Sequence, residues 1–177
     1  MLTFAPEDTL VALCVHGAKH LWYKLQWLCD IGELLCTHDR LDWERVMLQA
    51  QGSKRMLFLG LYLVQHVLGV TLPEEICRMV SKDSFLPILT SQVEEQWFQD
   101  APAVPGVFRL TWFRLQTLET LRNRGYFLCD TLFTPTPAEW EQVALPDILS
   151  PGYYVLRLLY LSSRHLWLPL TRLLKNN

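Results

Sequence analysis

Large apolar residues recur along this chain three and four positions apart, and runs in which they alternate with polar residues are nearly absent. The first spacing places side chains along one stripe of an α-helix, whereas strict alternation is the pattern of a half-buried strand. Half of the residues are hydrophobic, which supplies enough apolar material for a core and excludes an intrinsically disordered chain. The sequence therefore predicts an all-α fold, a compact bundle of about seven helices with no substantial sheet.

Helix starts and ends are marked by the residues that usually stand there. Pro6 lies at a predicted first turn together with Glu7 and Asp8, where the helix dipole favours acidic side chains. One continuous helix is predicted over residues 108–124, ended by Gly125. Further helix starts are predicted after Asp42, after Ser53, at residues 73–75, at residues 136–139 and at Pro151, and a further helix end at Gly69.

Residues that interrupt helices concentrate in the loop 100–106, "DAPAVPG". We expect this loop to separate an N-terminal helical part, residues 1–99, from a C-terminal helical part, residues 107–177, that packs on it. A length of 177 residues fits one domain, so both parts are predicted to share one core.

Charge and cysteine content exclude several partners and locations. The formal net charge of -2 gives no general attraction for nucleic acid, which we do not expect as a partner. The five cysteines include no Cys-x-x-Cys pair and predict reduced thiols in a cytoplasmic protein, with Cys29 and Cys36 buried on one helix face. The leucine-rich stretches 56–72 and 156–170 contain polar or charged side chains, and we expect core helices there, not membrane spans.

The most unusual stretch is residues 13–35, "LCVHGAKHLWYKLQWLCDIGELL". Read as one helix with a rotation of about 100° per residue, it separates into an apolar half and a polar half. Trp27 breaks this separation, because it falls inside the polar half close to His20. Burying an indole ring is favourable by about 2–3 kcal/mol, so we expect this face to be covered by the bundle, by a partner domain or by a ligand.

The same stretch does not predict a metal site. His16 and His20 are four residues apart, but the zinc-protease pattern His-Glu-x-x-His would need glutamate where Gly17 stands. On a continuous helix Asp30 would lie about 15 Å beyond His20, too far to share an ion. Glycine-rich phosphate-binding motifs are absent as well, so the residues by themselves predict no catalytic residue and no metal ligand.

Three long segments nevertheless resemble a bacterial family of nucleotidyltransferases. They are residues 5–35, "APEDTLVALCVHGAKHLWYKLQWLCDIGELL", residues 41–73, "LDWERVMLQAQGSKRMLFLGLYLVQHVLGVTLP", and residues 132–161, "LFTPTPAEWEQVALPDILSPGYYVLRLLYL". The first two are similar to the helical half of that family, and the third is similar to its closing part. The resemblance covers nearly the whole chain, from Phe4 to Leu161.

This resemblance implies a reaction for which the chain alone has no metal site. Nucleotidyltransferases carry a Gly-Ser turn and a pair of acids on a strand, and the acids hold two Mg²⁺ ions that bridge the nucleoside triphosphate. The sequence contains no Asp-x-Asp pair, and its Gly52-Ser53 pair precedes a predicted helix. We therefore expect a truncated C-terminal helical portion without catalytic competence alone. Mg²⁺ and a nucleoside triphosphate would bind only beside a separate catalytic domain.

The resemblance also selects residues that face a nucleotide or substrate, because the family segment H-x-x-x-H-x-W…W-L-x-D is matched here. It implies that His20 and Lys24 contact phosphates and that Asp30 orients a base or a hydroxyl. The full set of nucleotide- or substrate-facing candidates is His16, His20, Lys24, Trp27 and Asp30.

Two alternatives stay open from the sequence. In the first, the chain is a non-enzymatic helical module whose uncovered face binds a pathway protein. Independently of function, Asp30 can pair with a basic side chain and the histidines can bridge packed helices. In the second, the chain is an enzyme by itself, with a site built from the histidines, Asp30 and the C-terminal arginines.

Overall fold

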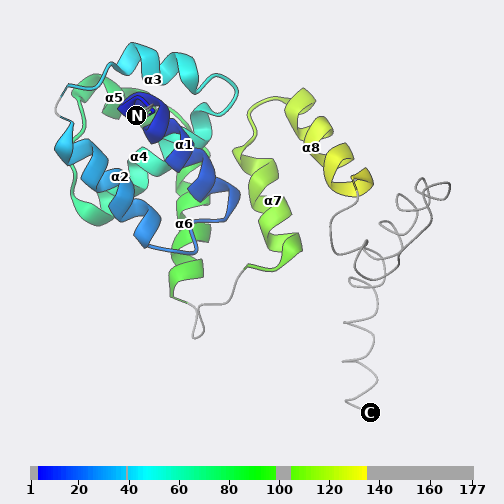
Figure 1. Cartoon of the computed structure of the whole chain (residues 1–177). Helices are drawn as coiled ribbons and strands as arrows, with labels where there is room; N and C mark the ends of the chain where they lie inside the picture. Colours follow the sequence, from blue (N-terminus) through cyan, green and yellow to red (C-terminus); the bar gives the residue numbers. More distant parts are fainter. Residues whose placement is uncertain (1–3, 39, 99–104, 135–177) are drawn as a thin grey trace. The chain divides into compact units, whose positions relative to one another are not determined.

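The computed structural model describes residues 4–38, 40–98 and 105–134, and these residues contain eight α-helices and no strand (Figure 1). The prediction of an all-α fold is therefore confirmed for the described part of the chain. The helices are α1 (Pro6–Lys19), α2 (Gln26–Thr37), α3 (Trp43–Gln49), α4 (Lys54–Leu68), α5 (Glu74–Val80), α6 (Leu86–Trp97), α7 (Val107–Thr117) and α8 (Leu121–Phe133).

The chain divides into two compact units, Met1–Leu121 and Arg122–Asn177. Helices α1 to α7 belong to the first unit, and α8 begins at the boundary. The division into parts 1–99 and 107–177 around a shared core stays a prediction. The features that follow all lie in the first unit, unless α8 is named.

Most helix ends lie where the sequence places them. Helix α1 begins at Pro6 with two acids in its first turn, and α5 begins directly after Pro73. The Asp42 carboxylate accepts a hydrogen bond of 3.0 Å from the backbone N–H of Arg45, which caps α3. Helix α4 ends at Gly69, whose φ of 70° is the left-handed conformation that glycine adopts without strain. The starts predicted at residues 136–139 and 151 lie outside the described residues.

Helix α4 is the centre of the first unit and contacts α1, α2, α5 and α6. Four of its leucines, Leu57, Leu59, Leu61 and Leu63, are fully buried although they point to different sides of the helix. A helix that is apolar on all sides is stable only when it is surrounded by other elements, as α4 is here. Within the described ranges, no helix is both long and apolar enough to cross a membrane.

Gly60 allows α1 to approach α4 closely. A Cβ atom built on Gly60 would lie 2.6 Å from the Sγ atom of Cys14, which is far closer than two such atoms pack. Cys14 is fully buried, and burial raises the pKa of its thiol far above the ordinary value. The predicted burial of Cys29 and Cys36 is wrong, because both side chains are exposed on α2.

Two predicted helices are each broken in the structure. Residues 13–35 form the end of α1 and most of α2, separated by a turn at residues 20–25. Residues 108–124 are divided between α7 and α8, with an extended backbone at Leu118 (ψ 128°), and Gly125 lies inside α8. The sequence carries no glycine or proline at either break, and its helical periodicity continues through both.

The break after α7 is stabilised by Arg55 at the start of α4. Its backbone N–H donates to the Glu119 carboxylate at 2.8 Å, and its guanidinium donates to the Gln116 carbonyl at 2.9 Å. The same guanidinium pairs with Asp83 at 2.9 Å and lies 4.3 Å from the centre of the Phe85 ring. These contacts hold residues 116–119 against α4, and one of them satisfies the Gln116 carbonyl, which in a continued helix would accept from a later backbone N–H.

Candidate functional site

The turn between α1 and α2 has an unusual backbone, because Leu21 and Trp22 both have positive φ angles, 54° and 48°. Helix α1 ends in a Schellman motif: the Trp22 N–H donates to the Gly17 carbonyl at 2.9 Å and the Leu21 N–H to the Ala18 carbonyl at 3.3 Å. Glycine normally occupies the left-handed position of this motif, and a leucine there costs about 1–2 kcal/mol.

Burial of the two side chains offsets this backbone cost. Leu21 and Trp22 are both fully buried, and each burial is favourable by about 1.5–3 kcal/mol. A Cβ atom on Gly17 would lie 2.4 Å from Cζ3 of Trp22, and one on Gly60 would lie 3.2 Å from Cζ2. The indole therefore fits between two glycines, one on α1 and one on α4, and this fit fixes the turn.

The turn brings four rings together at the end of α1 and the start of α2. The His16 ring centroid lies 4.8 Å from that of His20 and 4.8 Å from that of Trp27. Trp27 lies 5.6 Å from His20 and 5.0 Å from Tyr23, the latter in an edge-to-face arrangement. These are ordinary distances for attractive aromatic pairs. We call His16, His20, Tyr23 and Trp27 the ring cluster.

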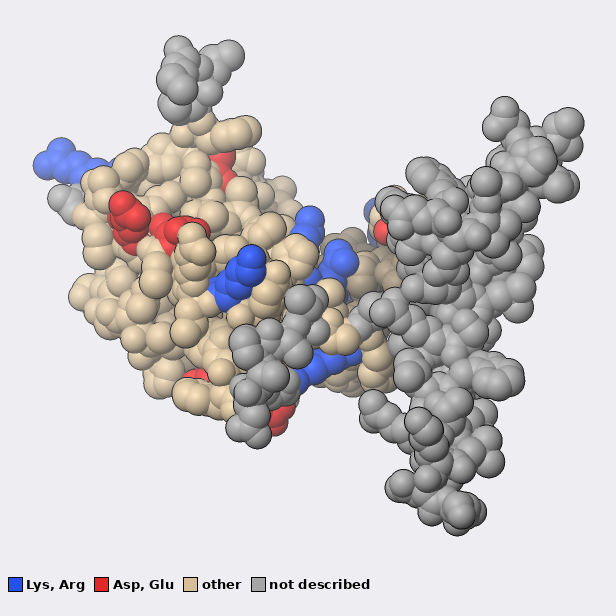
Figure 2. Space-filling view, turned by 60° about the horizontal axis from the view of Figure 1, so that its bottom comes forward, with Lys and Arg blue, Asp and Glu red and all other residues tan. Residues whose placement is uncertain are grey.

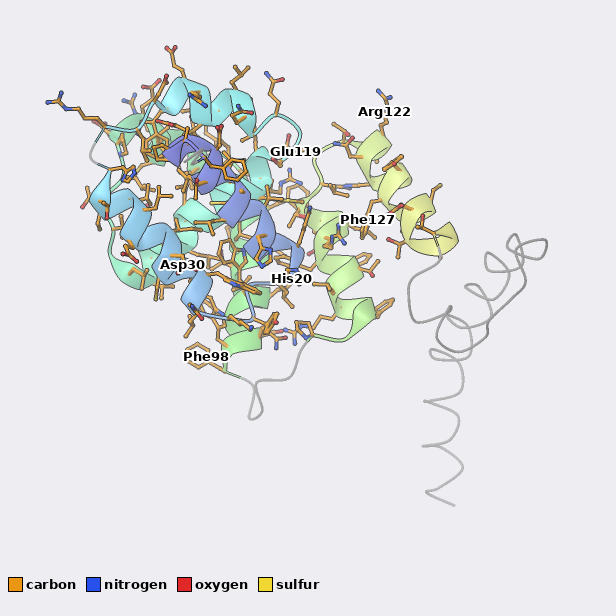
Figure 3. The ribbon with its side chains drawn as sticks, in the orientation of Figure 1. His20, Asp30, Phe98, Glu119, Arg122 and Phe127 are labelled. Carbon is orange, nitrogen blue, oxygen red and sulfur yellow. The ribbon has the colours of Figure 1, made fainter. Side chains whose placement is uncertain are left out.

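The ring cluster is open to solvent and has a positive charge beside it. His16 and His20 are exposed, Tyr23 and Trp27 are half-buried, and Figure 3 shows His20 at the end of α1. The Lys24 ammonium lies 5.6 Å from the centre of the Tyr23 ring and 5.9 Å from that of Trp27, within the range of a cation–π contact.

Electrostatics favour the neutral form of His20. Partial burial lowers its pKa below the usual 6.5, and the positive fields of His16, Arg114, Lys19 and Lys24 lower it further. Arg114 comes from α7, which contacts α1. Figure 2 brings the lower side of Figure 1 forward, and blue Lys and Arg side chains lie near the middle of the face that it shows. The surroundings of the ring cluster are therefore suited to an anion.

One comparison with known proteins bears on this site. Residues 1–69 match the model of a family described as "Uncharacterised nucleotidyltransferase". Neither the search of curated proteins nor that of solved structures returned a match. The matched segment spans α1 to α4 and so includes the whole ring cluster, whereas α7 with Arg114 lies outside it. The wider resemblance as far as Leu161, and a bacterial origin, stay predictions.

The structure brings together four of the five candidates: His16, His20, Lys24 and Trp27. Asp30 lies about one turn beyond Trp27 on α2 (Figure 3), and none of the ion pairs among the described residues involves its carboxylate. The distance of about 15 Å expected between His20 and Asp30 assumed a continuous helix, which the turn at residues 20–25 interrupts. Whether any of the five contacts a ligand stays a prediction.

Three further residues belong to this site and were missed from the sequence. Tyr23 and Lys19 are local, and the alternation of aromatic and basic residues over 16–27 could have indicated them. Arg114 lies far along the chain on α7, and no local pattern places it near His20.

Acidic residues give no metal site in the described part of the chain. No group of three or more His, Cys, Asp or Glu side chains there is arranged to hold a metal ion. The sequence contains one Asp-x-Glu, Asp42–Trp43–Glu44, but it lies at the start of helix α3 and Asp42 is engaged as the cap. It therefore lacks the strand position that the acid pair of a nucleotidyltransferase requires.

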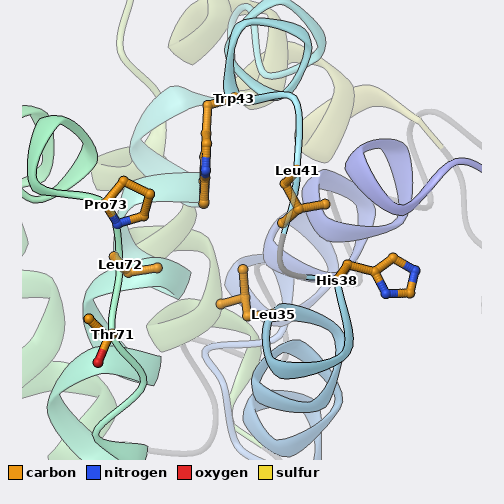
Figure 4. Close-up of a pocket in the computed structure, with 7 residues that line it drawn as sticks. All are labelled: Leu35, His38, Leu41, Trp43, Thr71, Leu72 and Pro73. Atoms are coloured by element: carbon orange, nitrogen blue, oxygen red, sulfur yellow. The ribbon is translucent and has the colours of Figure 1, made fainter.

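A separate cavity of about 310 Å³ lies between the end of α2, the start of α3 and the α4–α5 loop. Figure 4 shows the His38 ring directed away from the Trp43 and Pro73 side chains. Trp43 packs against the core, and Arg45 forms an exposed ion pair with Asp8 at 2.9 Å. The described residues that line this cavity include no Asp, Glu, Lys or Arg; they are Leu35, His38, Leu41, Trp43, Thr71, Leu72 and Pro73.

Proposed function

We propose that this chain contributes the helical, substrate-facing part of a nucleotidyltransferase, with the ring cluster turned toward the nucleotide. The observation that carries this proposal is the coincidence of two findings. The family match covers residues 1–69, and within that segment an exposed group of aromatic and imidazole rings is surrounded by positive charge.

The chemistry of the ring cluster suits both parts of a nucleotide. A base stacks on the face of an exposed indole or phenol ring, and each such contact contributes about 1–3 kcal/mol to binding. The Lys24 ammonium lies above the same rings and can bind a phosphate oxygen, with the Lys19 and Arg114 charges acting in support. Asp30 is proposed to orient a base or a hydroxyl at the edge of this surface.

Catalytic competence is proposed to need a further domain. The transfer of a nucleotidyl group requires Mg²⁺ held by paired acids, and the sequence has no Asp-x-Asp pair. We therefore propose that a separate Gly-Ser and paired-acid domain supplies the Mg²⁺ site. We also propose that the protein functions in the cytoplasm, since its five cysteines are all free thiols.

Calorimetric titration of the full chain with Mg-ATP, Mg-GTP and Mg-CTP tests this function. Saturable binding is expected, with a loss of about tenfold in affinity for His20→Ala, Lys24→Ala and Trp27→Ala, which is one good contact each. His38→Ala and Lys82→Ala are matched controls, because both side chains are exposed and outside the ring cluster. No binding to any of the three nucleotides would contradict the proposal.

A second candidate function is a non-enzymatic interaction module. It is favoured by two large aromatic side chains on α7, because Phe108 is 72% exposed and Trp112 is 56% exposed. Exposed aromatic residues are enriched at the centres of protein interfaces. A partner whose binding is lost in Trp112→Ala but kept in Lys24→Ala would support this function in place of the first.

A further inference from the structure

Trp97, the last residue of α6, makes a contact that its position in the sequence does not predict. Its indole N–H donates a hydrogen bond of 2.6 Å to the backbone carbonyl of Trp22, and its ring packs against the hydrophobic core. The acceptor is one of the two left-handed residues of the turn between α1 and α2. Trp97 therefore binds the part of the backbone that is under strain.

The turn decides whether the ring cluster exists. On a continuous helix, His20 and Trp27 would be separated by about 10 Å along the axis, and His16 and Trp27 by about 16 Å. In the structure their ring centroids lie 5.6 Å and 4.8 Å apart. The reversal of direction at Leu21 and Trp22 is thus the step that brings α1 histidines onto the α2 indole.

Two other contacts of the turn cannot replace the Trp97 hydrogen bond. The Schellman hydrogen bonds use the N–H groups of Leu21 and Trp22, and so they leave the Trp22 carbonyl to another donor. The Trp22 indole is fixed by its fit between Gly17 and Gly60, but its own N–H has no acceptor among the described residues. The Trp97 indole N–H is the donor that the structure supplies to this carbonyl.

We propose that Trp97 is a positioning residue: its hydrogen bond to Trp22 holds the left-handed turn in the conformation that assembles the ring cluster. The expected effect on nucleotide affinity rests on the proposed function. The role of Trp97 in holding the turn does not depend on that function. Trp97 does not touch the proposed ligand. It acts through the Trp22 carbonyl, and its effect on binding is indirect.

The decisive variant is Trp97→Phe, which keeps an aromatic ring and removes the N–H donor. Trp112→Phe is the matched control, since it removes an exposed indole from a neighbouring helix. In NMR spectra of the full chain, the ring-current shifts of the His16 and His20 ring protons should largely disappear in Trp97→Phe and persist in Trp112→Phe. The pKa of His20 should rise toward its ordinary value as the cluster loosens, and Mg-ATP affinity should fall about tenfold.

Unchanged histidine shifts in a folded Trp97→Phe protein would overturn the inference and leave the proposed function standing. If the wild-type chain does not bind Mg-ATP but the histidine shifts are lost in Trp97→Phe, the proposed function is overturned and the positioning role of Trp97 stands. Should Trp97→Phe fail to fold, hydrogen exchange of the Trp97 indole N–H in the wild-type protein decides the matter. Slow exchange is expected for a donor bonded at 2.6 Å, and exchange at the rate of a free indole overturns the proposal.

Discussion

The contact between Gly17 and Trp22 makes a sharp prediction, because replacing Gly17 with alanine adds one methyl group against a fully buried ring. The new Cβ atom would lie 2.4, 2.5 and 2.6 Å from three ring atoms, whereas carbon atoms pack at about 3.5–4.0 Å. The indole cannot retreat, since Gly60 of α4 lies on its other side. The variant must therefore separate α1 from α4 or displace Trp22.

The magnitude follows from two opposing effects. Overpacking of a dense core costs about 1–3 kcal/mol, and alanine gains up to about 1 kcal/mol over glycine inside a helix. Because the new methyl group would overlap three ring atoms, the upper end of the overpacking cost applies, and we expect Gly17→Ala to lower the free energy of unfolding by about 2 kcal/mol. For a chain of this length that corresponds to a fall in Tm of about 4–8 °C.

Thermal and urea unfolding monitored by circular dichroism measure this change. Gly32→Ala is the control: it is also a helical glycine, but the new methyl group would crowd only the Cδ1 atom of Leu68 at 3.0 Å, with Cγ2 of Val70 at an ordinary contact distance of 3.8 Å. Leu68 is 42% exposed and can rotate away, so this variant should stay within about 0.5 kcal/mol of the wild type. Equal stability of the two variants would show that the Gly17–Trp22 contact does not constrain the turn.

Three further predictions concern charged groups. Arg55→Ala should lower the free energy of unfolding by about 2–4 kcal/mol in urea titrations, because it leaves the largely buried Asp83 carboxylate unpaired; Arg78→Ala, in an exposed pair, should change it by less than about 0.5 kcal/mol. His20 has a lowered pKa, so the stability that depends on its neutral ring is complete above pH 6.5 and is lost as the pH falls and the ring is protonated. The difference in the free energy of unfolding between pH 7 and pH 5 should therefore be smaller in His20→Gln than in the wild type. An equal difference would refute this. Hydrogen bonds from the backbone N–H groups of Glu7 and Asp42 lower the pKa of the Glu7 carboxyl below 4.5. Glu7→Gln should therefore destabilise the protein at pH 7 and lose this effect as acid protonates the carboxyl, as acid unfolding curves can check.

The helix starts could be read from the sequence because they depend on local chemistry. Pro6, Asp42 and Pro73 act on the first turn of their own helices, and Gly69 ends α4 through its own backbone. The end of α1 could not be read in this way. Its left-handed position holds Leu21, which adopts that conformation only because tertiary packing buries the side chain.

The candidate site shows the same division between local and tertiary information. Trp27 fell inside the polar half of a wheel drawn for one long helix, and this anomaly was itself a sign that the helix is interrupted. The resemblance to a family selected His16, His20 and Lys24, which periodicity alone could not separate from an ordinary solvated face. Arg114 reaches the same neighbourhood only through the packing of α7 on α1.

The contacts of Arg55 have a practical consequence for anyone who wishes to isolate the family-matched segment. Residues 1–69 end with α4, but the Arg55 partners Asp83, Gln116 and Glu119 all lie beyond that point. A protein cut at residue 69 would expose the side of α4 that packs against α5 and α6 and leave this guanidinium without its carboxylate. A fragment that keeps these contacts has to extend through α7, to the end of the first compact unit at Leu121.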